Sequence, residues 1–195
     1  MRHAAFSDRN NIINIIADSF ARNPSVNWVI KQDERKSKRL LVFSAYAFET
    51  GMGRKGMYIS DAGNGVAICF KKNSKYNILK DLYWQARMAI QVVGLLRVKA
   101  ILDRESYLEK IRPSDGNYYY FWFFGVLTDE RNQGDALDLK NELLAKADRE
   151  KKSIFLETSV PKNMRVYQRY GFEIYHSWEV ESEGITLWCM KREPK

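Results

Sequence analysis

One stretch of the sequence combines residue types at a spacing that suits phosphate binding. An apolar segment at 117–126, NYYYFWFFGV, leads into a charged loop, and RNQGDA at 131–136 precedes an amphipathic helix. Unpaired backbone N–H groups at a helix N-terminus attract anions, and Gly134 lets a phosphate approach them closely, with Arg131 as an added cation. The same residues fit an ordinary turn with a helix cap. Neither GxxxxGK nor GxGxxG is present.

A second motif lies in IFLETSVPKNMRVYQRYGFEI at 154–174. Together the two motifs resemble the GNAT superfamily of acyl-CoA N-acyltransferases. In that family a Q/R-x-x-G-x-G/A segment binds the pyrophosphate of coenzyme A, and RNQGDA matches it. The later family signature matches Asn163, Tyr167, Gly171 and Phe172. With FLETS at 155–159 and WCM at 188–190, the likeness is closest to the puromycin N-acetyltransferase-like branch, and it covers residues 117–192.

The resemblance implies that acetyl-CoA is the cofactor. Backbone N–H groups around Phe124 and Val126, at the end of the apolar strand, are expected to stabilise the oxyanion of the acyl transfer. Asn163 is expected either to contact the cofactor or to cap the short helix that follows the next strand. The residues expected to bind the pyrophosphate are Arg131, Asn132, Gln133, Gly134, Asp135 and Ala136.

Two side chains are expected to carry the proton transfers. The leaving thiolate needs a proton, and a tyrosine, with an ordinary pKa of about 10, supplies one while staying protonated at neutral pH. Tyr167 stands at the family's tyrosine position and is expected to contact the cofactor as well. Glu157, at the end of its strand, is the candidate base for the attacking amine, directly or through water. Its alternative is a structural carboxylate that binds backbone N–H groups of the following loop.

Two residues of the phosphate motif depart from the GNAT pattern. Relatives often have Gly or Arg where Asn132 stands, and they usually have an apolar residue where Asp135 stands. The helix dipole favours a carboxylate at a helix N-terminus, but a carboxylate that points inward repels a pyrophosphate. Asp135 therefore either faces away from the cofactor or weakens the binding of coenzyme A.

The elements that position these residues follow from the apolar patterns. A first helix is predicted to end at Pro24, and a second to end before GMGRKG at 51–56. MYIS and GVAICF form a hairpin through DAGNG. The segment 78–110 is predicted to be helical. The residues of its expected apolar face are Tyr83, Ala86, Ile90, Val93 and Leu96.

The second half of the chain alternates strands and helices. The buried strand at 117–126 is followed by a helix, the strand SIFLETS, a short helix ended by Gly171, and two final strands joined by ESEG. This order predicts a mixed α/β (α+β) GNAT fold with one central mixed sheet and helices on both faces. Residues 1–195 are expected to form a single domain, in which the variable region 72–113 builds the acceptor pocket or a lid.

The composition limits the classes of function. The chain has 195 residues and a formal net charge of +8, but its basic residues alternate with acidic ones, which does not favour a nucleic-acid site. Two cysteines in apolar runs, with no signal peptide and no uninterrupted apolar span of about 20 residues, predict a cytoplasmic protein without a membrane segment. His3 and His176 lack the spacing of a metal site.

The acceptor is the least determined part of the prediction. The expected function is acetyl-CoA-dependent acetylation of a primary amine of a small molecule, by a monomer or homodimer. An alternative is acetylation of a protein or peptide amine, which needs an open groove instead of a closed pocket. A further alternative is a GNAT-fold module with weak or no acyl-CoA binding, for which Asp135 is the main support.

Overall fold

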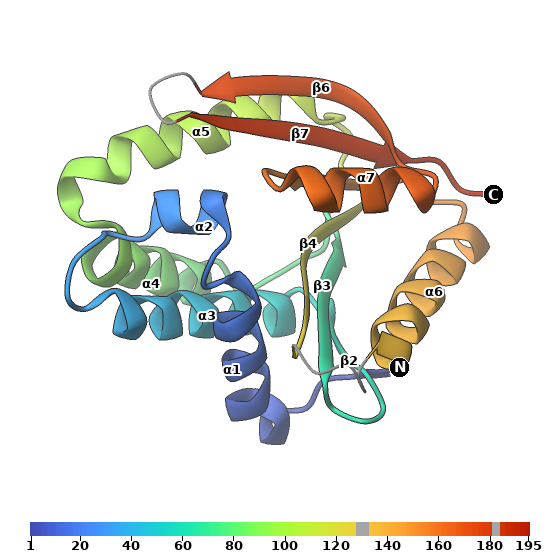
Figure 1. Cartoon of the computed structure of the whole chain (residues 1–195), viewed down its shortest axis with the longest axis horizontal. Coiled ribbons are helices and arrows are strands. Elements are labelled where there is room, and N and C mark those ends of the chain that lie inside the picture. The colour runs from blue at the N-terminus through green and yellow to red at the C-terminus, as the bar shows by residue number, and fades with distance from the viewer. Residues whose placement is uncertain (128–132, 181–183) are drawn as a thin grey trace.

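The computed structural model describes residues 1–127, 133–180 and 184–195. Its strands form one seven-stranded sheet, in the order β1-β2-β3-β4-β5-β7-β6. Strands β4 and β5 are parallel and the other neighbours are antiparallel. The strands are β1 (Arg2–His3), β2 (Met57–Ile59), β3 (Gly65–Lys71), β4 (Tyr119–Val126), β5 (Ile154–Thr158), β6 (Glu173–Val180) and β7 (Ile185–Arg192). Figure 1 shows helices on both faces of the sheet, which confirms the predicted mixed architecture.

The chain around Pro24 differs from the prediction. The helix α1 (Arg9–Phe20) ends before this proline, and Pro24 begins a further helix, α2 (Pro24–Val29). Proline suits the first position of a helix because the N–H that it lacks would have no partner there. The side chain of Asn23 accepts a hydrogen bond from the backbone N–H of Val26 at 3.1 Å and caps α2. The prediction that Pro24 ends the first helix was therefore wrong, because this residue begins the second helix.

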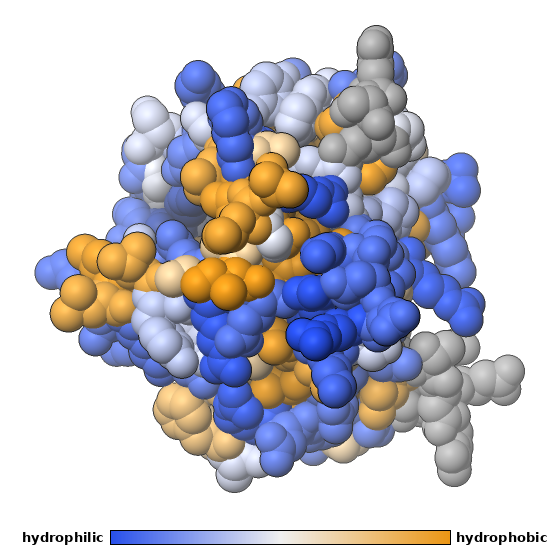
Figure 2. All heavy atoms as spheres, turned by 90° about the vertical axis from the view of Figure 1, so that its left-hand side faces the viewer, coloured by the Kyte–Doolittle hydropathy of each residue, from blue (hydrophilic) through white to orange (hydrophobic). Residues whose placement is uncertain are grey.

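The segment predicted as one helix at 78–110 is divided at Gly94. Its parts are α4 (Ile78–Met88), the π-helical turn η2 (Ala89–Val93), the 3₁₀ turn η3 (Leu95–Arg97) and α5 (Val98–Ile111). Gly94 has a φ of +83°, in the region that favours glycine. The predicted apolar face is mostly wrong, because Tyr83, Ile90 and Leu96 are 58%, 65% and 101% exposed. Val93 is buried as predicted, and the unpredicted Trp84 is buried as well. Figure 2 shows apolar side chains gathered on this side of the molecule.

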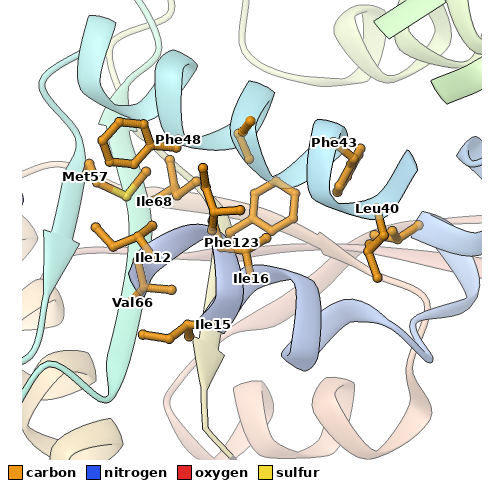
Figure 3. Close-up of a cluster of buried hydrophobic side chains, with 14 of the residues drawn as sticks. Ile12, Ile15, Ile16, Leu40, Phe43, Phe48, Met57, Val66, Ile68 and Phe123 are labelled. Carbon is orange, nitrogen blue, oxygen red and sulfur yellow. The ribbon is translucent and has the colours of Figure 1, made fainter. Parts of the chain in front are cut away.

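One hydrophobic core lies between the sheet and two helices, α1 and α3 (Lys36–Gly53) (Figure 3). Ile12 and Ile16 are fully buried, because residues four apart share one face of a helix. They belong to the same cluster as Phe48 of α3, Ile68 of β3 and Phe123 of β4. This cluster holds α1 and α3 against the strands that carry the candidate site.

A second core covers the opposite face of the sheet, under α6 (Gln133–Arg149) and α7 (Pro161–Arg169). Leu139, Leu143 and Ala147 are buried at the predicted helical spacing. The short helix α7 ends as predicted, because Gly171 has a φ of +86° and Phe172 donates its N–H to the carbonyl of Tyr167 at 3.1 Å. Every helix in the described ranges is too short or too polar to cross a bilayer.

The glycines in and after the last turn of α3 differ in the space around them, and this difference predicts opposite effects of substitution on stability. The helix continues through Gly51 and Gly53, past its predicted end. A Cβ at Gly56 would lie 2.5 Å from both the Cys69 carbonyl oxygen and Phe70 Cβ, whereas a Cβ at Gly53 meets no described atom within 4 Å. Gly56→Ala is expected to destabilise the protein by about 1–3 kcal/mol, measured by urea unfolding. Gly53→Ala, the matched control, should stabilise it by about 0.4–1 kcal/mol; equal effects would contradict this account.

Candidate active site

The candidate site begins where β4 and β5 separate. The two parallel strands pair at Tyr119 with Ile154 and at Tyr120 with Phe155. Beyond these positions β4 continues to Val126, and the register with β3 shifts between Ile68 and Cys69, which marks a bulge in this part of β4. A bulge bends a strand locally and turns it away from its neighbour. The edge of β4 that faces β5 is thereby opened at Phe124 and Val126, the two positions predicted to stabilise an oxyanion.

A cavity of about 500 Å³ opens at this separation. Its wall includes four of the predicted site residues: Phe124 of β4, Glu157 of β5, and Asn163 and Tyr167 of α7. The structure therefore brings these four residues to one space, although they come from three elements. Val126, at the end of β4, lies outside the wall that the described residues form.

The predicted phosphate motif coincides with the start of a helix. Gln133, Gly134, Asp135 and Ala136 form the first turn of α6, which starts with Gln133. Gly134 is exposed, and a Cβ added to it would meet no atom of the described residues within 4 Å. A helix N-terminus with open space beside its glycine suits a pyrophosphate group. The other two residues of the motif, Arg131 and Asn132, lie outside the described residues.

Tyr167, the predicted general acid, packs in the second core and lines the cavity. Its ring packs against Phe121 and Phe172, with centroid distances of 6.3 Å and 5.6 Å. Burial raises the pKa of Tyr167 above its ordinary value, so the phenol keeps its proton at neutral pH. Within residues 1–127, 133–180 and 184–195, no side chain hydrogen-bonds to its hydroxyl group. The proton is therefore available to a group in the cavity.

Glu157 is held by two side chains that the sequence did not point to. Its Oε1 accepts a hydrogen bond from Arg112 Nε at 2.9 Å, and its Oε2 accepts one from the Tyr120 hydroxyl at 2.7 Å. Arg112 Nη2 also donates to the Tyr120 hydroxyl at 3.1 Å. The alternative expected from the sequence was that Glu157 is a structural carboxylate bound by backbone N–H groups of the following loop. Its hydrogen-bond partners are instead the side chains of Arg112 and Tyr120, so this alternative was wrong in its partners. Each carboxylate oxygen has two acceptor sites, so Glu157 can still accept a proton directly or through water while Arg112 and Tyr120 hold it in place.

Asn163 does not cap α7, as one interpretation of the sequence proposed. The N-cap position is occupied by Val160, and Pro161 is the first residue of the helix. Asn163 lies in the first turn, exposed and on the wall of the cavity. Its amide is therefore accessible for a ligand contact, which remains a prediction.

The helices α2, α4 and α5 form one side of the cavity wall, which we call the roof. The residues of this side were not among the site residues predicted from the sequence. Arg104 of α5 donates to Ser25 Oγ of α2 at 2.5 Å, and the Ser25 N–H donates to Ser159 Oγ, after β5, at 3.2 Å. These bonds connect the roof to the strand that carries Glu157. Glu105, next to Arg104, lines the cavity and is accessible from it. Sequence spacing gave no signal for Glu105 and Arg112, because Arg112 follows the last residue of α5 in an extended conformation.

No protein-family model matches the chain. Several solved structures are similar over nearly its whole length. A Corynebacterium glutamicum protein described as histone acetyltransferase HPA2 and related acetyltransferase has 17% sequence identity and a TM-score of 0.71, covering 100% of this chain and 95% of its own. The C-terminal condensation domain of Ebony, in complex with beta-alanyl-dopamine, has 14% identity and a TM-score of 0.69, with coverages of 97% and 96%.

Arylalkylamine N-acetyltransferase 2 from Aedes aegypti has 16% identity and a TM-score of 0.64, with coverages of 100% and 98%. At these identities the likeness is one of fold. A putative acetyltransferase of the GNAT family from Desulfovibrio desulfuricans shares the same overall arrangement, with a TM-score of 0.55. The chain therefore has the fold of the GNAT acetyltransferases.

Proposed function

We propose that the protein is an N-acetyltransferase that moves the acetyl group of acetyl-CoA to a primary amine of a small molecule. The observation that carries the proposal is the cavity at the separation of β4 and β5, which Tyr167 lines. The first turn of α6 offers the backbone N–H groups that a pyrophosphate would bind, with Gly134 leaving open space beside them. Acetyl-CoA supplies the activated acetyl group.

The residues of the chain account for the steps that the transfer requires. Backbone N–H groups of β4 near Phe124 and Val126 would stabilise the negative charge on the carbonyl oxygen when the amine attacks. The hydroxyl of Tyr167 would give its proton to the leaving sulfur, because its raised pKa keeps it protonated until then. Glu157 is the proposed base, acting directly or through water; Arg112 and Tyr120 fix its position.

A small-molecule acceptor is favoured over a protein by the covering of the site. The helices α4 and α5 supply part of the cavity wall, and their segment forms a roof over the space where a protein acetyltransferase would need an open groove. The volume of about 500 Å³ is in the range of small-molecule pockets. The resemblance of the 155–172 motif to the puromycin N-acetyltransferase-like branch supports the same acceptor class.

Thermal unfolding with acetyl-CoA tests this function directly. A ligand present at a hundredfold excess over its dissociation constant should add about 2.7 kcal/mol to the free energy of unfolding. We expect acetyl-CoA to raise the melting temperature, and we expect thiol release when a primary amine is added. Desulfo-coenzyme A is the matched control for binding without transfer. No shift at millimolar acetyl-CoA would leave a GNAT-fold module without acyl-CoA binding as the better account.

A further inference from the structure

We propose that the acceptor is an amine carried on an aromatic or similarly apolar body, which the cavity binds with the ammonium group against the Glu105 carboxylate. This inference rests on the proposed function and names the substrate class of the same site. Two properties of the cavity support this acceptor class: its aromatic wall and the pairing of its charged side chains.

The wall of the cavity is aromatic on several sides. Side chains of α1, α3, β3 and β4 contribute rings to it, and six of these residues are Phe20, Phe43, Tyr46, Phe70, Trp122 and Phe124. These rings make edge-to-face contacts with one another and with Phe123, which also lines the cavity. The ring centroids of Tyr46 and Trp122 lie 5.7 Å apart, and those of Phe20 and Phe123 lie 4.7 Å apart. Rings that are already fixed lose little freedom when a flat apolar group packs against them. Such a wall favours an apolar body over a polar one.

Glu105 is the carboxylate of the wall for which the described residues provide no hydrogen-bond donor. The other two already accept hydrogen bonds: Asp81 from Gln85 Nε2 at 2.9 Å, and Glu157 from Arg112 and Tyr120. Across the described ranges, no hydrogen bond or ion pair reaches Glu105. Its side chain is exposed and lies on the cavity wall. Its oxygens can therefore accept hydrogen bonds from a ligand.

The cations of the wall face partners of their own. Lys72 donates to Glu109 at 2.8 Å, and Arg112 to Glu157. The Arg54 guanidinium lies 3.8 Å from the centroid of the Tyr76 ring, and Arg104 bonds Ser25. The ion pairs of Lys72 and Arg112 reduce the positive field that a substrate ammonium would meet. Arg54 and Arg104, by contrast, contact neutral groups and keep their charge.

Charged groups on several sides of the cavity act on the Glu105 carboxylate, whose side chain is exposed at the cavity wall. Desolvation raises the pKa of Glu105; the nearby Glu157 acts in the same direction, and Arg112, Arg104 and Lys72 act against it. An arriving ammonium would form a charge-assisted hydrogen bond with this carboxylate, which is stronger than a bond between neutral groups. The same cavity holds Tyr167, so an amine at Glu105 is kept in one space with the proposed acid.

Binding measurements on the full chain test the inference independently of turnover. Calorimetry with 2-phenylethylamine, with and without acetyl-CoA, is compared with ethanolamine, which keeps the amine on a polar body, and with 2-phenylethanol, which keeps the ring without the amine. We expect 2-phenylethylamine to bind at least tenfold more tightly than either. Glu105→Gln should weaken 2-phenylethylamine about 10- to 100-fold while the thermal shift by acetyl-CoA stays unchanged.

Asp103→Asn is the matched control, because Asp103 lies on the same helix, pairs with Lys99 at 2.7 Å and is 65% exposed. It should leave 2-phenylethylamine binding unchanged. Equal binding of 2-phenylethylamine by the wild type and Glu105→Gln, or equal binding of ethanolamine, would overturn the inference even if acetyl-CoA binds. A thermal shift that is absent with acetyl-CoA but present with 2-phenylethylamine, and dependent on Glu105, would instead overturn the transferase and leave this amine site standing.

Discussion

Replacing Tyr167 with phenylalanine is expected to lower the turnover number by about 10²- to 10⁴-fold, the usual contribution of a general acid. The substitution removes the hydroxyl group but keeps the ring, whose contacts with Phe121 and Phe172 hold it in the second core. The affinity for acetyl-CoA should therefore change little. Thiol release under saturating substrates measures the turnover number, and calorimetry measures the affinity.

Tyr170→Phe is the control for this experiment. Tyr170 follows α7 directly, packs against the same core and has Lys140 Nζ 4.1 Å from its ring centroid, but it does not belong to the described cavity wall. Its loss of a hydroxyl should leave turnover within about twofold, since no proton transfer is assigned to it. Equal turnover of Tyr167→Phe and the wild type would remove Tyr167 from the mechanism. A parallel loss of stability and turnover would assign it a packing role instead.

Arg112→Met is expected to destabilise the protein by about 3–5 kcal/mol, the cost of removing one partner of a buried ion pair. The side chains of Arg112 and Glu157 are 2% and 7% exposed, so the substitution leaves a carboxylate shielded from water without its cation. Tyr120 would be the remaining hydrogen-bond donor to Glu157 among the contacts described above. Urea unfolding monitored by circular dichroism gives the free energy of unfolding.

Two further variants show whether the lost charge pair is the cause. Arg112→Met combined with Glu157→Gln removes both charges and should recover most of the stability. Lys99→Met breaks an exposed pair, with side chains 87% and 65% exposed, and should cost less than about 1 kcal/mol. A double variant as unstable as Arg112→Met alone would show that lost packing, and not the unpaired carboxylate, sets the cost.

The parts of the fold that could be predicted have a strong local signal. The unit β5–α7 was predictable because an apolar strand, a proline at the first helical position and Gly171 at a positive φ each indicate the same boundaries. The α4–α5 segment was not, since apolar residues occur on both sides of it. Only tertiary contact decides that Trp84 is buried and that Leu96 is exposed.

The candidate site divides in the same way. Tyr167 and Asn163 could be located because they stand in a motif of fixed spacing, and Phe124 because it ends an apolar strand. Arg112 and Glu105 carry no such signal, since charged residues in a polar helix usually face solvent. They become part of the site because α5 and the residue after it contribute to the wall of the same cavity as β4 and β5. That placement depends on contacts far apart in the sequence, such as the bond between Arg104 and Ser25.

Trp122 gives the cavity an optical property of its own. Its indole lies in the cavity wall, edge-on to Tyr46 at 5.7 Å and to Phe123 at 4.7 Å. Indole emission depends on the polarity of its surroundings and on quenching groups nearby. A molecule that enters and displaces water will therefore change the fluorescence of the unlabelled protein, so that filling and emptying of the site can be followed in real time.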